Sequence, residues 1–128
     1  KENAKKPSRG TPRTAPPSFG PIPKSCSTYS GNRAIGCTLL LAANFGLDQM
    51  PCLDKMWTRE SNWRTTADNP SSHSYGIPQA LPASKMAAFG SDYRTNPATQ
   101  IKWGLHYIVG RYKTPCGAWT FWQAHNWY

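Results

Sequence analysis

The sequence has few acidic residues and no long apolar run. Six Asp and Glu stand against 15 Lys and Arg in 128 residues, so the formal net charge is +9 at pH 7. A transmembrane helix needs about 18 or more consecutive apolar residues, and the sequence contains no such run. We therefore expect no membrane span. The scarcity of acidic residues also singles out the two glutamates, Glu2 and Glu60.

The positive charge is concentrated at the N-terminal end. Residues 1–33 hold seven basic side chains and one acidic one, a net +6, whereas residues 34–128 hold eight and five, a net +3. The first segment also contains six of the 12 prolines, and such a composition cannot bury a core. We expect a basic, proline-rich disordered tail or linker over residues 1–33 and a single domain over residues 34–128.

A basic tail has two interpretations. It is either a solubilising linker or a segment that binds an anionic partner such as an acidic cell-wall polymer. Nucleic acid is not expected as a partner, because the charge lies in the tail and no motif of interleaved aromatic and basic residues accompanies it.

The four cysteines form an even set in a short chain. This favours disulfides and an oxidising, extracytoplasmic compartment. Three pairings of Cys26, Cys37, Cys52 and Cys116 are open. No two cysteines show Cys-x-x-Cys spacing, and the three histidines lie far from them in the sequence, so we expect no structural zinc and no other metal site.

The apolar pattern predicts a mostly α-helical domain. Helices are expected over residues 34–45, 51–62, 83–89, 98–112 and 116–123, with a loop or short hairpin over residues 64–82. Asn32 is expected to cap the first helix and Gly46 to end it. Asn96 should begin the fourth helix, and Pro115 separates it from the last one.

Glu60 lies on the apolar side of the second predicted helix. Leu53, Met56 and Trp57 precede it by seven, four and three residues, a spacing that puts them on the same face of a helix. Burial among apolar groups raises the pKa of a carboxyl group. A raised pKa lets a general acid keep its proton near neutral pH.

Two motifs resemble a known family. Glu60-Ser61-x-Trp63 is followed, after a turn-rich segment, by Tyr75-Gly76-Ile77-Pro78-Gln79. This order resembles the soluble lytic transglycosylases and goose-type lysozymes, in which a Glu-Ser pair ends a helix and a Gly-hydrophobe-x-Gln segment follows it in the cleft. Segment 52–63, together with segments 76–82, 96–101 and 103–108, is most similar to the transglycosylase-like domains at the C-termini of secreted actinobacterial wall proteins. The resemblance covers residues 32–128.

The resemblance implies a lysozyme-like fold and a glycosidase. The implied substrate is peptidoglycan, cut at the β-1,4 bond between N-acetylmuramic acid and N-acetylglucosamine, with Glu60 as the catalytic acid. In the family the same glutamate then acts as a base towards the muramic acid 6-hydroxyl, which gives a 1,6-anhydro product by lytic transglycosylation. The alternatives are a muramidase that hydrolyses the bond and a non-catalytic peptidoglycan-binding module of the same fold. We expect a secreted or wall-associated monomer that needs no cofactor.

Most glycosidases use a second carboxylate, and the domain offers four aspartates. Asp54 lies six residues before the glutamate and points to another side of the helix. Asp48 and Asp92 lie at helix boundaries, where capping explains them. Asp68, in the loop after the catalytic helix, is the remaining candidate helper, although an Asx-turn is the commoner role for such a residue. The lack of a convincing partner favours the anhydro product over hydrolysis.

Five further residues are candidate substrate contacts. By the resemblance, Gln79 contacts the sugar, Tyr107 hydrogen-bonds near the catalytic glutamate, and Ser61 completes the Glu-Ser pair. Trp119 stands where the family has a tyrosine, and Tyr75 offers a ring that can stack on a sugar. The structural alternatives are a loop amide for Gln79 and core aromatics for Tyr75 and Trp119.

The resemblance also bears on the cysteines. Cys52 and Cys116 resemble a pair that ties the catalytic helix to the start of the last helix in the subgroup, which leaves Cys26 to bond Cys37. The subgroup does not generally carry a cysteine at the position of Cys37, so this residue is a departure from its pattern.

Overall fold

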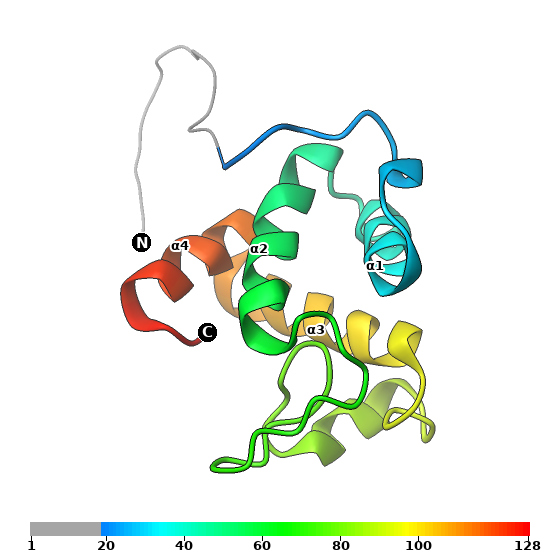
Figure 1. Cartoon of the computed structure of the whole chain (residues 1–128), viewed down its shortest axis with the longest axis vertical. Helices are drawn as coiled ribbons and strands as arrows, with labels where there is room; N and C mark the ends of the chain where they lie inside the picture. The colour runs from blue at the N-terminus through cyan, green and yellow to red at the C-terminus, as the bar shows by residue number, and fades with distance from the viewer. Residues whose placement is uncertain (1–18) are drawn as a thin grey trace.

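The computed structural model describes residues 19–128, and this part of the chain is mostly α-helical (Figure 1). It contains four α-helices, α1 (Gly31–Ala42), α2 (Met50–Ser61), α3 (Pro97–Tyr112) and α4 (Pro115–His125). Three short 3-10 helices accompany them, η1 (Cys26–Thr28), η2 (Leu47–Gln49) and η3 (Ala83–Phe89). Within residues 19–128 there is no strand, only isolated bridges of Asp68 and Ala80 to Tyr75. The predicted mostly α class is confirmed.

Helix α1 starts earlier than predicted. It begins at Gly31 rather than at residue 34, so Asn32 lies inside the helix. The Asn32 side-chain amide donates to the Trp63 carbonyl at 2.9 Å and to Thr65 Oγ1 at 3.0 Å. The prediction that Asn32 caps this helix was wrong, because its side chain has partners on a segment that is distant in the sequence.

Helices α1 and α2 end close to a residue with a left-handed backbone, and α3 begins at a side-chain cap. Helix α1 stops before Asn44, which has a φ of 71°, and so ends earlier than the predicted stop at Gly46. Asn62, with a φ of 53°, ends α2 close to its predicted limit. Asn96 Oδ1 accepts the Ala98 N–H at 2.9 Å and begins α3 as predicted.

Trp57 lies in the core that α2 shares with the other helices. Its side chain is fully buried, and its ring meets the Trp63 ring edge-on, with 5.1 Å between the centroids. Helix α3 approaches the Trp57 ring at Gly104, where a Cβ atom would lie 2.6 Å from a ring carbon. The absence of a side chain at Gly104 therefore sets how closely α3 approaches α2.

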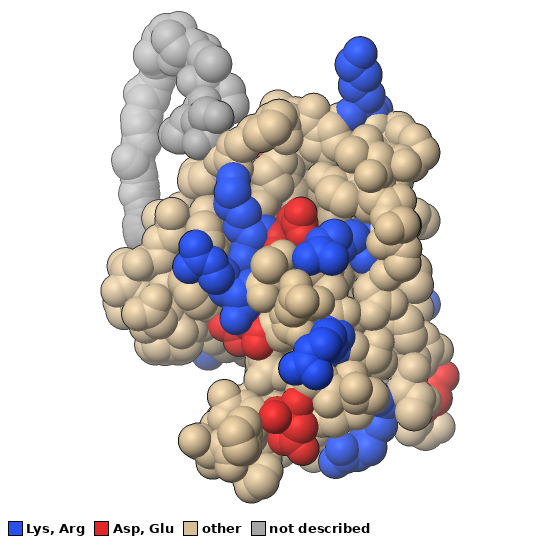
Figure 2. Space-filling view, viewed as in Figure 1, with Lys and Arg blue, Asp and Glu red and all other residues tan. Residues whose placement is uncertain are grey.

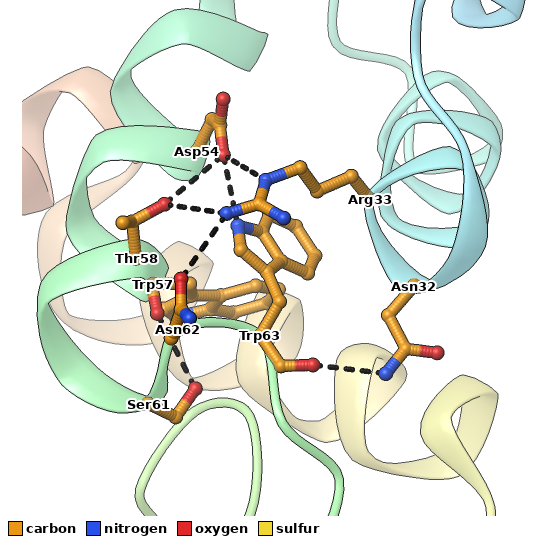
Figure 3. A network of polar contacts seen from close by, with 8 residues as sticks. All are labelled: Asn32, Arg33, Asp54, Trp57, Thr58, Ser61, Asn62 and Trp63. Atoms are coloured by element: carbon orange, nitrogen blue, oxygen red, sulfur yellow. Dashed lines mark hydrogen bonds and ion pairs between the residues drawn. The ribbon is translucent and has the colours of Figure 1, made fainter.

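A polar network orients α1 against α2 (Figure 3). Arg33 of α1 forms an ion pair with Asp54 of α2, with 2.9 Å between Nε and Oδ1 and side chains that are 35% and 30% exposed. The same carboxylate oxygen accepts the Trp63 Nε1–H at 2.9 Å. Partly exposed ion pairs add little free energy, so the main effect of this network is to fix the orientation of Asp54 towards α1.

Part of the predicted tail lies against the helices. The segment before α1 passes from α2 towards α1 (Figure 1), and Cys26 in it is bonded to Cys37 of α1. The Lys55 ammonium group donates to the Phe19 carbonyl. Phe19 and Tyr29 are partly buried against the core. Residues 1–18 of the predicted tail lie outside the described residues.

A second disulfide joins the start of α2 to the start of α4. It pairs Cys52 with Cys116, with 5.0 Å between the Cα atoms, and the Cys26–Cys37 pair has a Cα separation of 5.5 Å. Both pairings implied by the resemblance are confirmed. Among the helices of residues 19–128, none has the length and apolar character required to cross a bilayer.

The loop between α2 and η3 is attached to α3 through Gln100. The Gln100 side chain is fully buried, and its Oε1 accepts the Ile77 N–H at 2.9 Å. Its Nε2 donates to the Thr65 carbonyl at 2.9 Å and to the Tyr93 carbonyl at 2.8 Å. Gly76 leaves the space for this amide, because a Cβ atom there would lie 2.6 Å from Gln100 Oε1, and its φ is +80°.

We expect Gly76→Ala to destabilise the fold. The new Cβ atom would clash with the Gln100 amide, and the alanine would have to keep the left-handed backbone conformation of Gly76. Each effect costs on the order of 1 to 2 kcal/mol. Urea unfolding should show a loss of about 2 to 4 kcal/mol. The matched control is Gly110→Ala in α3, because no atom lies within 4 Å of a Cβ there. This control should raise stability by about 0.5 to 1 kcal/mol, and an equal loss in both variants would contradict the role of Gly76.

Candidate functional site

Glu60 lies in the last turn of α2 and borders a cavity of about 350 Å³. The outline in Figure 2 is indented between the C-terminal segment and the loop that follows α2, and acidic atoms lie at the inner end of this indentation. The cavity is lined by the side chains of two basic residues, one acidic residue, several aromatic rings and the loop. These residues are Glu60, Ser74, Pro78, Gln79, Leu81, Lys85, Trp103, Tyr107, Arg111, Trp127 and Tyr128.

Trp122 of α4 is the hydrogen-bond partner of Glu60 within residues 19–128. Its indole Nε1–H donates to Glu60 Oε2 at 2.5 Å. The Trp122 ring is stacked on the Trp119 ring, with 5.5 Å between the centroids, and the Arg59 guanidinium carbon lies 5.7 Å from the centroid of the Trp122 ring. These contacts hold the indole in the orientation that reaches the carboxyl group.

The surroundings of Glu60 favour its protonated form. Burial raises the pKa of the Glu60 carboxyl above its ordinary value, and the hydrogen bond from Trp122, which favours the charged form, offsets only part of that shift. An indole can only donate, so it occupies Oε2 in either charge state and leaves Oε1 to carry the proton. A carboxyl group in this condition suits a general acid.

The Tyr128 hydroxyl connects α2 with the loop at the cavity wall. It accepts the Trp57 Nε1–H at 2.8 Å and donates to the Pro78 carbonyl at 2.8 Å. Burial raises the pKa of the Tyr128 phenol well above its usual range, and the Glu60 carboxyl raises it further, so the hydroxyl keeps the proton that it donates. Asn126, with a left-handed φ of 64°, turns the chain after α4 so that Tyr128 reaches α2.

Tyr107 of α3 contributes another part of the wall. Its hydroxyl donates to the Tyr128 carbonyl at 3.0 Å and accepts from Arg111 Nη1 at 2.9 Å. Its ring is stacked on Trp103 with 5.2 Å between the centroids and meets the Tyr128 ring edge-on at 5.5 Å. These rings give the cavity flat apolar surface with polar groups at its edges, which suits a ligand that has both kinds of surface.

Gln79 and Ser61 hold the loop beside the cavity. Gln79 has a φ of 57°, and its amide nitrogen donates to the Ala67 and Gly76 carbonyls at 3.1 and 2.9 Å. With both N–H groups in use, the amide oxygen is the part of Gln79 that can receive a hydrogen bond from a ligand. The buried Ser61 hydroxyl donates to the Ile77 carbonyl at 2.7 Å, so Ser61 supports the loop and does not line the cavity.

Tyr75 and Trp119 do not line the cavity. Tyr75 is buried, and its hydroxyl donates to the Arg94 carbonyl at 2.9 Å. Trp119 is buried among the core residues and stacked on Trp122. Both residues are therefore core aromatics and not substrate contacts, because neighbouring side chains enclose their rings.

Asp68 does not line the cavity either. It is exposed and lies 3.7 Å from the ring of His73, measured from Oδ1 to Nδ1. An Asx-turn is present one residue later, where Asn69 Oδ1 accepts the N–H groups of Ser71 and Ser72 at 2.8 and 3.1 Å. Asp68 is therefore not placed to help Glu60, because it does not line the cavity. The Asx-turn that was its alternative role is formed by Asn69.

The sequence analysis did not identify Trp122, Tyr128, Lys85 or Arg111 as site residues. Trp122 contacts Glu60 across 62 residues and Tyr128 contacts Trp57 across 71 residues, so no local pattern connects them. The one available signal was the content of six Trp and six Tyr in a chain of 128 residues.

No protein-family model, characterised protein or solved structure matches this chain. In the described part of the chain, no three His, Cys, Asp or Glu side chains are grouped so that they could hold a metal ion.

The raised pKa of Glu60 predicts a pH-dependent difference in stability between the wild type and Glu60→Gln. The folded state binds the Glu60 proton more tightly than the unfolded state, so its stabilising effect is complete below the ordinary carboxyl pKa and is lost as the pH rises through the raised one. Thermal unfolding from acid to neutral pH should show the wild type losing stability relative to Glu60→Gln, by about 1.4 kcal/mol for each tenfold difference in proton affinity between the folded and unfolded states.

The control for this measurement is Asp68→Asn, which removes a carboxyl group from an exposed loop. The free energy of unfolding of Asp68→Asn should stay within about 0.5 kcal/mol of the wild-type value from acid to neutral pH. If the difference in stability between the wild type and Glu60→Gln were the same at every pH, the raised pKa of Glu60 would be contradicted.

Proposed function

We propose that this protein is a secreted, lysozyme-like enzyme that cleaves peptidoglycan between N-acetylmuramic acid and N-acetylglucosamine, with Glu60 as its single catalytic acid and base. The observation that carries the proposal is a half-buried carboxyl of raised pKa on a cavity that also contains Gln79 and Tyr107. These are three of the residues that the family resemblance selects from the sequence.

Glu60 provides the acid that the first step requires. The proton on its carboxyl group is transferred to the glycosidic oxygen while the bond from that oxygen to C1 of the muramic acid breaks, and the ring gains oxocarbenium character. The resulting Glu60 carboxylate keeps the indole hydrogen bond to Oε2. That hydrogen bond favours the charged form, so Trp122 stabilises the product of proton transfer.

The lining of the cavity supports the anhydro route over hydrolysis. Among residues 19–128, Glu60 is the one acidic residue that lines it, whereas the usual second carboxylate lies within about 5 to 10 Å of the first. Asp54 is paired with Arg33, and Asp92 accepts from Thr99 at 2.9 Å. The muramic acid 6-hydroxyl can instead attack C1 and give its proton to the Glu60 carboxylate, which restores the acid and yields the 1,6-anhydro sugar.

The two disulfides favour an extracytoplasmic location, because such bonds persist in oxidising compartments. Peptidoglycan lies in such a compartment. The basic residues of segment 1–33 fit a role in holding the enzyme to anionic wall polymers.

The test is digestion of purified peptidoglycan, followed by mass spectrometry of the soluble fragments. The wild type should release muropeptides with 1,6-anhydro ends, which are lighter by one water than hydrolysis products. Glu60→Gln keeps the size and the Trp122 contact but removes the transferable proton, so the rate should fall by about 100-fold or more. Asp68→Asn should retain the wild-type rate within about twofold, because Asp68 is away from the cavity.

Three other outcomes would contradict all or part of this proposal. Fragments with reducing ends in place of anhydro ends would identify a hydrolytic muramidase. Loss of activity in Asp68→Asn would contradict the single-carboxylate mechanism. If folded wild-type protein released no fragments but sedimented with insoluble peptidoglycan, the enzyme proposal would be wrong and the domain would be a binding module.

A further inference from the structure

The cavity next to Glu60 carries an excess of positive charge. Lys85 from η3 and Arg111 from α3 line it, while within residues 19–128 Glu60 supplies the one acidic side chain that does so. Because the pKa of Glu60 is raised, this carboxyl offsets the two cations less than an ordinary glutamate would. The site is therefore electrically suited to an anionic ligand.

Neither cation is neutralised by the protein. In the described part of the chain, the ion pairs are Arg33 with Asp54 and the contact between His73 and Asp68, and neither Lys85 nor Arg111 takes part in one. Surface cations usually gain little from a partner, but two unpaired cations on the wall of one cavity are available to a ligand that enters it.

Arg111 is held in position by aromatic contacts and not by a carboxylate. Its Nη1 donates to the Tyr107 hydroxyl at 2.9 Å. Its guanidinium carbon lies 5.4 Å from the Tyr107 ring centroid and 5.8 Å from that of Tyr112. One N–H group of the guanidinium is used in this way, and the others can bind a carboxylate in a two-point contact.

We propose that Lys85 and Arg111 bind a carboxylate of the peptide stem, so that the enzyme prefers glycan strands whose stems are acidic. This inference rests on the proposed function. The sugar rings of the strand are uncharged, and the lactyl carboxyl of muramic acid is already bound as an amide to the stem. The free carboxylates of such a substrate therefore lie on the stem, which extends from the muramic acid beside the bond to be cut.

The arrangement divides recognition between two kinds of surface. The ring of Trp127, which is 51% exposed and lines the cavity, supplies an apolar face for a sugar, and the two cations supply charge for the stem. A strand without stem carboxylates uses only the first surface and should bind less tightly. The two cations contribute to substrate binding, so their removal should raise KM and change kcat little.

The test compares two substrates that have the same glycan and stem but differ in whether the stem carries carboxylates or neutral amides. One is a purified glycan strand with acidic stems, and the other is the same strand with its stem carboxylates converted to amides. Wild-type protein should have a KM about tenfold lower for the acidic strand. The double variant Lys85→Gln, Arg111→Gln should lose this preference, through a higher KM on the acidic strand and little change on the amidated strand.

Lys102→Gln is the matched control, because it removes one positive charge from the same helix as Arg111. Lys102 lines a separate apolar cavity with Phe89 and Val109, so its loss should leave the preference for the acidic strand intact. An equal rise in KM on both strands in the double variant, or the same loss of preference in Lys102→Gln, would overturn the carboxylate site.

A binding measurement separates this inference from the proposed activity. Calorimetric titration of Glu60→Gln with the acidic and the amidated strand needs no cleavage. Tighter binding of the acidic strand that disappears when Lys85→Gln and Arg111→Gln are added supports the carboxylate site even if the wild type cuts nothing. Equal affinity for the two strands would refute the site even if the wild type is active.

Discussion

The buried amide of Gln100 is the contact on which the rest of the site depends. It binds three backbone groups from different parts of the chain, Ile77, Thr65 and Tyr93, and thereby ties the long loop to α3. An amide buried in this way costs free energy unless all its hydrogen bonds are made. The loop conformation that satisfies the amide is consequently favoured over others, and this conformation brings Gln79 to the cavity.

The loop is then joined to α2 by two hydroxyl groups. Ser61 donates to the Ile77 carbonyl and Tyr128 donates to the next carbonyl, that of Pro78. Since Ser61 follows Glu60 directly, the same turn of helix carries both the half-buried carboxyl group and the support for the loop beside the cavity. The site is thus built from α2, the loop, α3 and the chain after α4, and none of these segments could form it alone.

The parts of the site that the sequence could predict are those set by local spacing. Glu60 precedes the end of a helix whose apolar face is visible in the sequence, and two disulfides followed from the resemblance. Asn32 was assigned wrongly, because capping propensity is local while its partners at Trp63 and Thr65 are brought near by folding. Trp122 was missed for the same reason, since its contact with Glu60 joins residues 62 positions apart. Arg111 contacts Tyr107 within α3, but its place on the wall of the cavity that Glu60 borders depends on how the helices pack.

The Cys52–Cys116 disulfide has a consequence for what a single cut in the backbone would do to this protein. The bond joins residues that are 64 positions apart in the sequence, and the exposed loop tip at residues 69–73 lies between them. A protease that cut the tip would leave two fragments still covalently joined, with the helix that bears Glu60 attached to the helix that bears Trp122. After such a cut, the Glu60 carboxyl and its hydrogen-bond donor would stay within one covalently joined molecule.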